Sequence, residues 1–396
     1  MKVRSVGVII VISSLLLTGC YGQKNIQDLT YVIAFGIDYD QTKEEMIIKA
    51  LALDFTNVAK QEGAKPIPPP PEWIGQGKGK TVEEAIAKLY ENSQPDLYLQ
   101  HVKAIIITEN AITHKFKEIN ESLARSNFFR FSVFMFSTTA SLDDIFKTKA
   151  LFFYPQTFAV YVKPRKEEGE SNMLSPKSYR EFLSEYFEPV GATYLPSLGI
   201  YNNSWVQDNE KYPLVQINGA HFFENQNYQG HLPLNEIMGI RWENQEKKKK
   251  TYIIEDPAHK RTVVRVTTSH LTIHTVNPTK PAFKLRVKGT AEILENVNNL
   301  SEKEIKKKIE KLIGEEIKKT YGKGLEINSD ILRLGTNWFR FYNEDYLKFT
   351  RKHPGNDYLN KDSLQNIKVT INIRTSDNYK SKTHSNVYDT KSIYEK

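Results

Sequence analysis

The chain has 396 residues, 39% of them hydrophobic, a formal net charge of +8 and a single cysteine. This length exceeds what one hydrophobic core usually serves, so two or three domains are expected, and one cysteine excludes an internal disulfide framework. Basic residues are spread along the chain instead of forming an aromatic-lined stripe, which argues against a nucleic-acid partner.

The amino terminus carries the pattern of a secretory leader. Lys2 and Arg4 precede an apolar run over residues 6–17, which is right for a signal-peptide core and too short to cross a bilayer. Two small residues then precede Cys20, whose thiol can be alkylated by a lipid. We predict a signal peptide over residues 1–19 and lipidation of Cys20. A secreted chain without lipid, or a buried structural thiol, is the alternative.

Cleavage before Cys20 would leave 377 residues with a net charge of +6, because Lys2 and Arg4 leave with the leader. Each buried methylene of an acyl chain contributes about 0.8 kcal/mol, so a diacylated chain is expected to stay anchored to a membrane. No later segment offers about 18 uninterrupted apolar residues, and everything after Cys20 is therefore expected outside. A mildly basic ectodomain suits an anionic lipid or wall polymer surface.

Strands and helices alternate in the first half, which predicts an N-terminal α/β domain over residues 20–205. Thr81 and Glu84 have capping-box spacing and predict a helix entry. Prolines over residues 66–71 predict an extended surface loop, and the polar segment 201–212 is the expected domain boundary. The other expected elements are a hairpin over 31–38 and 46–55, strands over 102–108 and 131–137, and helices over 116–125, from 141, and over 179–187.

The second half predicts a C-terminal α+β domain over residues 206–375, with room for a subdivision that would give three parts in all. Ser301 and Glu304 again have capping-box spacing, at the start of an amphipathic helix over 301–321. The polar tail 376–396 is expected to be disordered. The other expected elements are strands over 214–223, 263–276, 283–294 and 367–373, a turn at 225–227 and a short helix over 235–242. The predicted fold class is α+β, with several mixed sheets packed by helices.

Residues 75–81 invite comparison with a phosphate-binding loop, because Gly79, Lys80 and Thr81 precede a helix. That motif needs a glycine five positions before Gly79, and Ile74 stands there. We therefore interpret the segment as a flexible helix entry. The dense basic run over 247–250 is interpreted as a solvated loop.

The histidines do not form a recognisable metal site. His270 and His274 are four apart in an alternating β segment, where strand rise would separate them by about 13 Å. His101, His221 and His231 are interpreted as structural residues. We expect no metal ion and no cofactor.

No catalytic constellation is recognisable either. The sequence has no Gly-x-Ser-x-Gly elbow and no His-Glu-x-x-His motif. The acidic pairs Asp143-Asp144 and Glu315-Glu316 fall in helical turns, where adjacent residues do not converge on one substrate. We expect no catalytic residues.

Segments along nearly the whole chain resemble the Ger(x)C lipoproteins, the C subunits of bacterial spore germinant receptors. Tyr21-Gly22 stands where that family usually has Trp-Asp after the lipidated cysteine. The segments that carry the resemblance are 19–21, 25–29, 34–38, 80–85, 101–107, 218–223, 230–232, 236–242 and 330–335.

The resemblance implies a non-enzymatic receptor subunit with a three-part mixed α/β architecture. It would be lipid-anchored on the outer face of the spore inner membrane beside integral-membrane A and B subunits, and required when nutrients trigger germination. A scaffold or regulatory subunit is the first hypothesis. A solute-binding lipoprotein that captures a nutrient directly is the second, and a wall-active hydrolase is the third.

Overall fold

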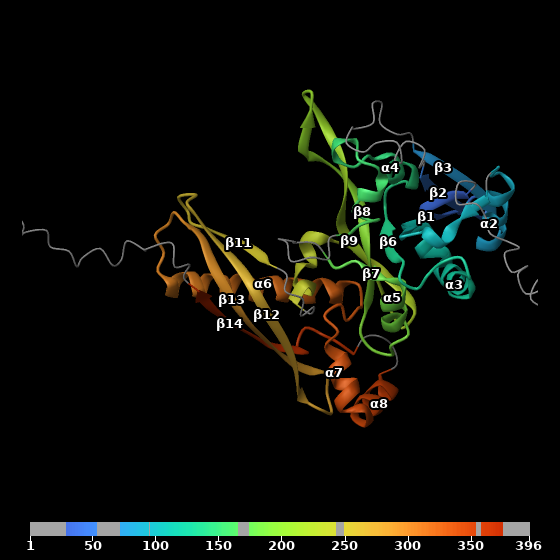
Figure 1. Cartoon of the computed structure of the whole chain (residues 1–396). Coiled ribbons are helices and arrows are strands. Elements are labelled where there is room, and N and C mark those ends of the chain that lie inside the picture. The colour runs from blue at the N-terminus through green and yellow to red at the C-terminus, as the bar shows by residue number, and fades with distance from the viewer. Residues whose placement is uncertain are drawn as a thin grey trace, which may run out of the picture.

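The structure, a computed structural model, describes six stretches of the chain: residues 29–53, 72–94, 96–164, 174–242, 249–353 and 358–374. Cys20, the predicted leader, the proline-rich loop over 66–71 and the tail 376–396 lie outside these residues, and so do Lys247 and Lys248 of the basic run over 247–250. Lys250 begins strand β11 (Lys250–Glu255) and is only 1% exposed, with its ammonium 3.7 Å from the ring centre of Trp242, so the prediction of a solvated loop is wrong for this residue. The fold is α+β, with two mixed sheets covered by helices (Figure 1).

The first sheet follows the order β10-β9-β8-β6-β5-β1-β2-β3, with β4 beside β1 and β7 beside β6. Its central strands β1, β5, β6 and β8 are parallel, and antiparallel strands extend both sides. The strands are β1 (Leu29–Asp40), β2 (Glu45–Leu53), β3 (Trp73–Gly79), β4 (Asp96–Tyr98), β5 (Ala104–Thr108), β6 (Phe134–Thr138), β7 (Lys177–Ser178), β8 (Thr193–Gln207), β9 (Glu210–Glu224) and β10 (Asn227–Pro233).

Helices cover both faces of this sheet because its central strands are apolar on both sides. All five residues of β5 are buried, as expected for a parallel strand between two helical layers. One face packs against α2, α3 and α5, and the other against α4, whose cluster continues into the second sheet. These helices are α2 (Val82–Glu91), α3 (Glu109–Arg125), α4 (Leu142–Lys147) and α5 (Tyr179–Tyr186).

Residues 73–79 form a strand and not the flexible helix entry that the sequence predicts. β3 pairs antiparallel with β2, and helix α2 starts directly after it. A Cβ on Gly77 would lie 2.0 Å from the carbonyl oxygen of Ala85, and one on Gly79 would lie 2.7 Å from the Ala85 nitrogen. The glycines therefore let α2 lie directly on the strand. Thr81 caps the helix as predicted, because its hydroxyl accepts a hydrogen bond from Glu84 N.

The polar segment 201–212 is the outer half of a long hairpin. β8 and β9 pair from Thr193 to Gln207, and the far end of the hairpin projects from the body of the molecule (Figure 1). Trp205 pairs with Tyr212, so aromatic residues sit among the polar ones that suggested a linker. The first sheet thus contains strands from both sides of the predicted 205/206 division, which stays a prediction.

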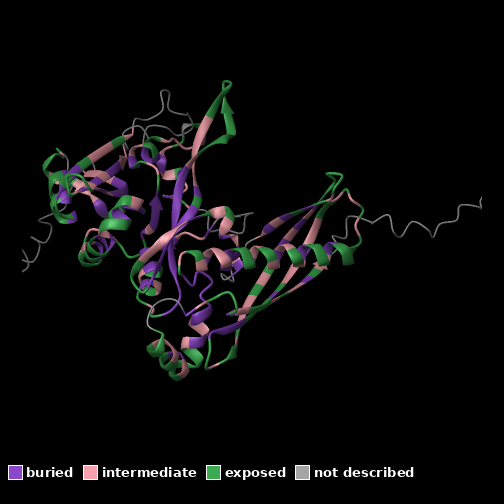
Figure 2. Ribbon diagram, turned by 180° about the vertical axis from the view of Figure 1, so that it is seen from behind, coloured by how far each residue is buried: buried purple, intermediate pink, exposed green. Residues whose placement is uncertain are grey.

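The second sheet has the order β11-β12-β13-β14, and the long helix α6 lies across one face of it (Figure 2). Ser301 and Glu304 form the predicted capping box, and α6 runs five residues beyond the expected end at residue 321. The short helix expected over 235–242 is instead two 3-10 turns. The remaining elements are β11 (Lys250–Glu255), β12 (Arg261–Asn277), β13 (Ala282–Asn296), β14 (Leu364–Arg374), α6 (Glu302–Glu326), α7 (Leu334–Phe341) and α8 (Asn343–Lys352).

Within the part of the chain that the structure describes, no helix combines the length and the apolar character needed to cross a membrane.

Candidate functional site: a buried ionic junction and an exposed aromatic patch

The residues that the sequence raised as chemical candidates are separated in the fold. His270 and His274 lie exposed on strand β12. Asp143 forms an ion pair with Lys49, with 2.5 Å between Nζ and Oδ2. Glu316 accepts hydrogen bonds from Arg241 and Trp242, whereas the neighbouring Glu315 points to solvent near Lys311. Within the described residues, no three metal-ligating side chains gather in the arrangement of an ion site.

His221 is fully buried on β9, the second strand from one edge of the first sheet. Its Nδ1 lies 2.8 Å from Ser137 Oγ, and its Nε2 lies 3.6 Å from a carboxylate oxygen of Glu109. A serine, a histidine and a carboxylate follow one another here as in a hydrolase triad, but the arrangement does not meet the other requirements of such a site. The Ser137 side chain is completely buried and its hydroxyl lies 3.1 Å from the carbonyl oxygen of Leu195, so a substrate has no access to it.

Burial decides the charge state of this histidine. Burial, followed by the neighbouring His231, lowers the pKa of His221 to about 3. The two rings are 4.6 Å apart, and burial lowers the pKa of His231 as well. Both imidazoles are therefore neutral at physiological pH and serve the packing between β9, β10 and β6.

A network of buried ionic groups joins the α6–α7 connection to the first sheet. Asp330 is 3% exposed, and its carboxylate accepts hydrogen bonds from Leu334 N (2.9 Å), Gly335 N (2.7 Å) and the Tyr358 hydroxyl (2.7 Å). A Cβ on Gly335 would lie 2.4 Å from that hydroxyl oxygen, so only glycine leaves room for the contact. Asp330 thereby caps the first turn of α7.

Arg333 forms the contacts between this buried junction and the first half of the chain. Its guanidinium donates to the carbonyl oxygen of Ala192 at 3.1 Å and forms ion pairs with Glu188 and Glu185. Lys177 is the second cation bound to Glu185. Burial raises the pKa of Glu185, but the charges of Lys177 and Arg333 together outweigh burial and leave this pKa below its ordinary value.

Glu224 is the last member of the junction, and its pKa is shifted in the opposite direction from that of Glu185. It is 2% exposed, and its Oε2 accepts a hydrogen bond of 2.7 Å from Asp330 N. Burial, followed by the negative charge of Asp330, raises the pKa of Glu224 to about 8. Because Asp330 accepts three hydrogen bonds and Glu224 accepts this one, we assign the proton of the pair to Glu224 at neutral pH.

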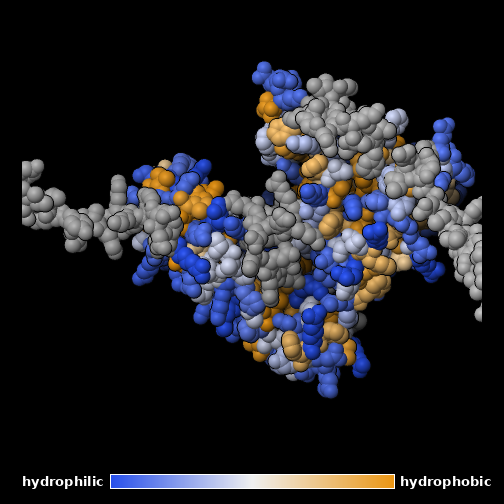
Figure 3. Space-filling view, viewed as in Figure 1, coloured by the Kyte–Doolittle hydropathy of each residue, from blue (hydrophilic) through white to orange (hydrophobic). Residues whose placement is uncertain are grey.

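An aromatic patch lies on the outside of the molecule, where the β8–β9 hairpin meets the segment after α4. We define it as Phe152, Tyr154, Phe158 and Trp205, each between 46% and 57% exposed. Ring centroids are 6.2 Å apart for Phe152 and Tyr154, 6.3 Å for Phe152 and Trp205, and 5.0 Å for Tyr154 and Phe158. Figure 3 shows hydrophobic surface gathered just below the hydrophilic tip of this hairpin.

A hydrogen bond from a side chain to the backbone holds the two halves of the patch together. The Tyr212 hydroxyl, on the strand opposite Trp205, donates to the carbonyl oxygen of Ala150 at 3.0 Å. Phe152 has φ of 58°, in the left-handed region that a bulky side chain rarely adopts. Strain of this kind is retained where surrounding contacts impose it, often at binding surfaces.

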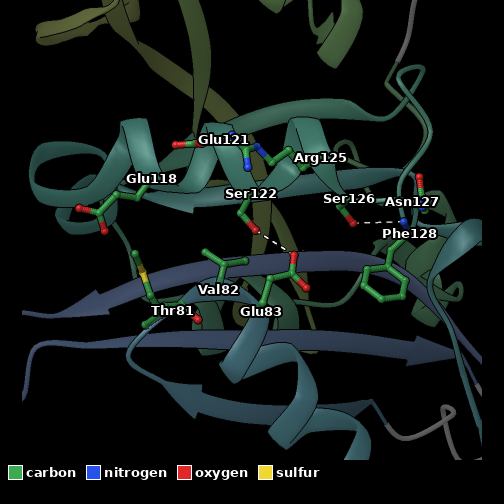
Figure 4. A pocket seen from close by; sticks show the side chains of 11 residues that line it. Thr81, Val82, Glu83, Glu118, Glu121, Ser122, Arg125, Ser126, Asn127 and Phe128 are labelled. Atoms are coloured by element: carbon green, nitrogen blue, oxygen red, sulfur yellow. Dashed lines mark hydrogen bonds and ion pairs between the residues drawn. The ribbon is translucent and has the colours of Figure 1, made fainter.

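An open groove of about 680 Å³ runs between α2 and α3 (Figure 4). The Ser122 hydroxyl donates across it to Glu83 at 3.0 Å, and Arg125 pairs with Glu121 at 2.6 Å along one wall. With Glu118 the groove carries three carboxylates and one guanidinium. Its volume lies in the range of small-molecule sites, although it is open to solvent.

Sequence reasoning pointed to part of this arrangement. The segment 330–335 was singled out by resemblance, and its aspartate and glycine are the capping pair described above. The aromatic patch was missed, because Trp205 stands in a polar stretch and Phe152 is 53 residues earlier. Only the turn of the chain after α4 brings them together.

Comparison with known proteins agrees with this architecture. Residues 22–200 match the family described as "Spore germination protein N-terminal domain", and residues 218–377 match "Spore germination B3/ GerAC like, C-terminal". The chain is similar to spore germination protein A3 of Bacillus subtilis (strain 168), 23% identical over 231 residues, which are 58% of this chain and 57% of that relative.

Two further likenesses cover more of the chain. Spore germination protein GerQC of Bacillus cereus is 22% identical over 320 residues, which are 79% of this chain and 82% of that protein. The crystal structure of the GerBC protein matches with a TM-score of 0.52 and 16% identity, over 86% of this chain and 98% of that one, which shows a shared fold. Because the two family matches together span most of the sequence, the chain belongs to the Ger(x)C family of spore germination proteins, the C subunits of germinant receptors.

Proposed function

We propose that this chain is a lipid-anchored, non-enzymatic subunit of a nutrient germinant receptor. Cys20 tethers it to the outer face of the spore inner membrane, where it binds the integral-membrane A and B subunits as a scaffold or regulatory subunit. Family membership supports the receptor role, and the leader that ends at Cys20 supports the anchor. The observation that carries the docking role is the aromatic patch.

The patch has the properties of a protein-binding hot spot. Aromatic side chains are enriched at the centres of protein interfaces and contribute most of the binding energy there. The four rings come from two segments that are already held together by the Tyr212 to Ala150 hydrogen bond, so little ordering is needed when a partner binds. A neighbouring cation, Lys163, lies 5.7 Å from the ring centre of Phe158 and supplies a polar rim.

The buried junction supports a regulatory role for the same subunit. Arg333 connects the region that matches the C-terminal family to Glu185, Glu188 and Ala192 in the region that matches the N-terminal family, so buried charges and a hydrogen bond link the two halves of the chain. A partner bound at the patch on the first half would therefore be connected to the second sheet through these junction contacts.

Docking is tested with the double variant Trp205→Ala and Phe158→Ala in the full chain. The measurement is copurification of integral-membrane proteins from spore membranes, together with the rate of nutrient-triggered germination. Loss of a hot-spot ring typically weakens binding by at least about 2 kcal/mol, or roughly thirtyfold. Trp73→Ala is the control, because Trp73 is 60% exposed on β3 and lies outside the patch. Unchanged copurification in the double variant would contradict docking through this surface.

The anchor is tested separately with Cys20→Ala. The variant is expected to leave the membrane fraction and to slow germination, while its ectodomain keeps its melting temperature. Mass spectrometry of the wild-type chain should show an acylated amino terminus. An unmodified thiol in a membrane-retained protein would remove the anchor from the proposal.

A solute-binding lipoprotein is the second candidate, favoured by the groove between α2 and α3. Its carboxylates and Arg125 together suit a nutrient that carries both an amine and an acid group. A ligand at 100 times its Kd stabilises the folded protein by about 2.7 kcal/mol, so thermal melting with each nutrient separates the two candidates. A melting curve that no nutrient moves would eliminate direct capture.

A further inference from the structure

The face of the second sheet opposite α6 is strongly basic. Leu285 and Val287 of β13 are buried toward α6, so their neighbours Lys284, Arg286 and Lys288 project from the other face, where they are exposed. Lys368 of β14 is exposed on the same side. We call these four residues the basic face. Because their side chains are exposed, no element among the described residues covers them.

The strand register places like charges against one another on this face. Arg286 lies directly opposite Lys368, and none of the four cations of the basic face lies directly opposite a carboxylate. Like charges directly opposite each other destabilise a sheet. None of the four cations of the basic face forms an ion pair with a described carboxylate. The fold thus carries a repulsion that nothing in the described chain relieves.

The exposed side of helix α6 differs from the basic face in its charge pattern. Helix α6 exposes lysines too, but they alternate with glutamates and form pairs such as Lys306 with Glu310 and Lys311 with Glu315. On β13 the first acidic residue is Glu292, which already lies between Arg265 and Arg374 in the register. A one-signed, uncompensated face is a steering and docking surface for an anion.

The geometry of the basic face indicates an extended anionic surface and not a single ion. Its side chains project from a sheet about 4.8 Å apart across strands and about 7 Å apart along them, with no surrounding walls. The face contains no aromatic ring and is rich in lysine, which is depleted at the centres of protein interfaces. Anionic phospholipid headgroups match both properties.

The tail of the chain, which follows the edge strand β14 of this face, does not supply the missing charge. The tail that follows β14, residues 375–396, has four lysines against three acidic residues. It is therefore not complementary to a basic surface. A membrane leaflet is the anionic surface nearest to a chain that is tethered by lipid.

We propose that the basic face binds the anionic headgroups of the membrane surface, as a second membrane contact besides the acyl anchor. The two contacts would fix the orientation of the ectodomain, whereas an acyl chain alone leaves it free to rotate. This inference rests on the proposed location at a membrane, but the headgroup contact does not need the acyl chains, so each can fail separately.

The test uses the mature chain, residues 20–396, with Cys20→Ala so that no acyl chain is present. Binding is measured by cosedimentation with vesicles of phosphatidylglycerol and phosphatidylcholine, and with vesicles of phosphatidylcholine alone. We expect binding to the anionic vesicles only, and weaker binding as salt shortens the Debye length below about 10 Å. At roughly 1 kcal/mol for each basic residue, Arg286→Gln with Lys288→Gln should weaken binding about 30-fold.

Lys307→Gln with Lys318→Gln is the matched control. It removes the same charge from the exposed side of α6, on the opposite face of the sheet, and should leave binding within about twofold. Thermal melting of both variants shows that they are folded. Equal weakening in the control, equal binding to uncharged vesicles, or complete competition by inorganic phosphate at constant ionic strength would each overturn the proposal.

Discussion

Arg333 donates a hydrogen bond from its guanidinium to the carbonyl oxygen of Ala192, which is 141 residues earlier in the chain. The Ala192 nitrogen in turn donates to the carbonyl oxygen of Asp330 at 3.1 Å. Both backbone groups of one residue thus bind the same short segment before α7. This reciprocal pair is the centre of the junction between the two regions that the family matches define.

Removal of Arg333 should destabilise the whole chain. Arg333→Met leaves Glu188 without its buried partner and Glu185 with only Lys177, and loss of one partner from a buried pair typically costs about 3 kcal/mol. Urea unfolding measures the change. Arg340→Met is the control, since Arg340 binds the same Glu188 at 3.0 Å but is largely exposed, and it should cost less than about 1 kcal/mol. Equal costs would show that the junction contributes little.

Glu224 should make the protein less stable as pH rises. Its pKa is raised from about 4.5 to about 8 in the folded state, so between these values the folded chain binds a proton that the unfolded chain lacks. Stability from this group is complete below pH 4.5 and is lost on the way to pH 8. Glu224→Gln, which mimics the protonated acid, should flatten that decline when urea unfolding is repeated across the window. A decline of unchanged slope would assign it to another group.

His221 should make the protein less stable as pH falls, which is the opposite of the effect expected for Glu224. Its pKa is lowered from 6.5 to about 3, so the unfolded chain binds the extra proton between these values. Stability is complete above pH 6.5 and falls by up to about 1.4 kcal/mol per pH unit below it. His221→Asn, which keeps a polar atom near Ser137, should reduce this slope. Urea unfolding repeated across this window measures the slope, and an unchanged slope in the variant would contradict the assignment to His221.

Two glycines should respond oppositely to the same substitution. Gly77→Ala places a methyl group 2.0 Å from the Ala85 carbonyl oxygen and should destabilise by about 1–3 kcal/mol, because α2 must move off β3. Gly314 lies in α6 with no atom within 4 Å of an added Cβ. Gly314→Ala should therefore stabilise by about 1 kcal/mol through helix propensity. Thermal melting compares the two, and a tolerated Gly77→Ala would contradict the close packing of α2.

Most elements were predictable because their signals are local. The capping serines and threonines, the apolar stripe of α6 and the period-two pattern of β12 and β13 each lie within one segment, where chain geometry alone relates neighbours. Among the exceptions, the segment 235–242 forms two 3-10 turns in place of the expected helix. Two others are β3, whose glycines indicated a flexible helix entry, and the polar end of the β8–β9 hairpin. In both, pairing with a neighbouring strand outweighs a composition that favours a loop.

The basic face, the aromatic patch and the junction are also only partly visible in the sequence. The alternation of Lys284, Arg286 and Lys288 is visible in the sequence, but their opposition to Lys368 appears only when β14 pairs in register with β13. The patch and the junction likewise join residues dozens of positions apart.

By itself, the sequence determined the α+β class and the family resemblance, and it predicts an export signal with Cys20 as the lipid acceptor, since the signal for each of these lies in the local spacing of residues. Tertiary structure alone decided which charges are paired and which are left facing solvent, because ion pairing and burial depend on distances that only the packed chain establishes.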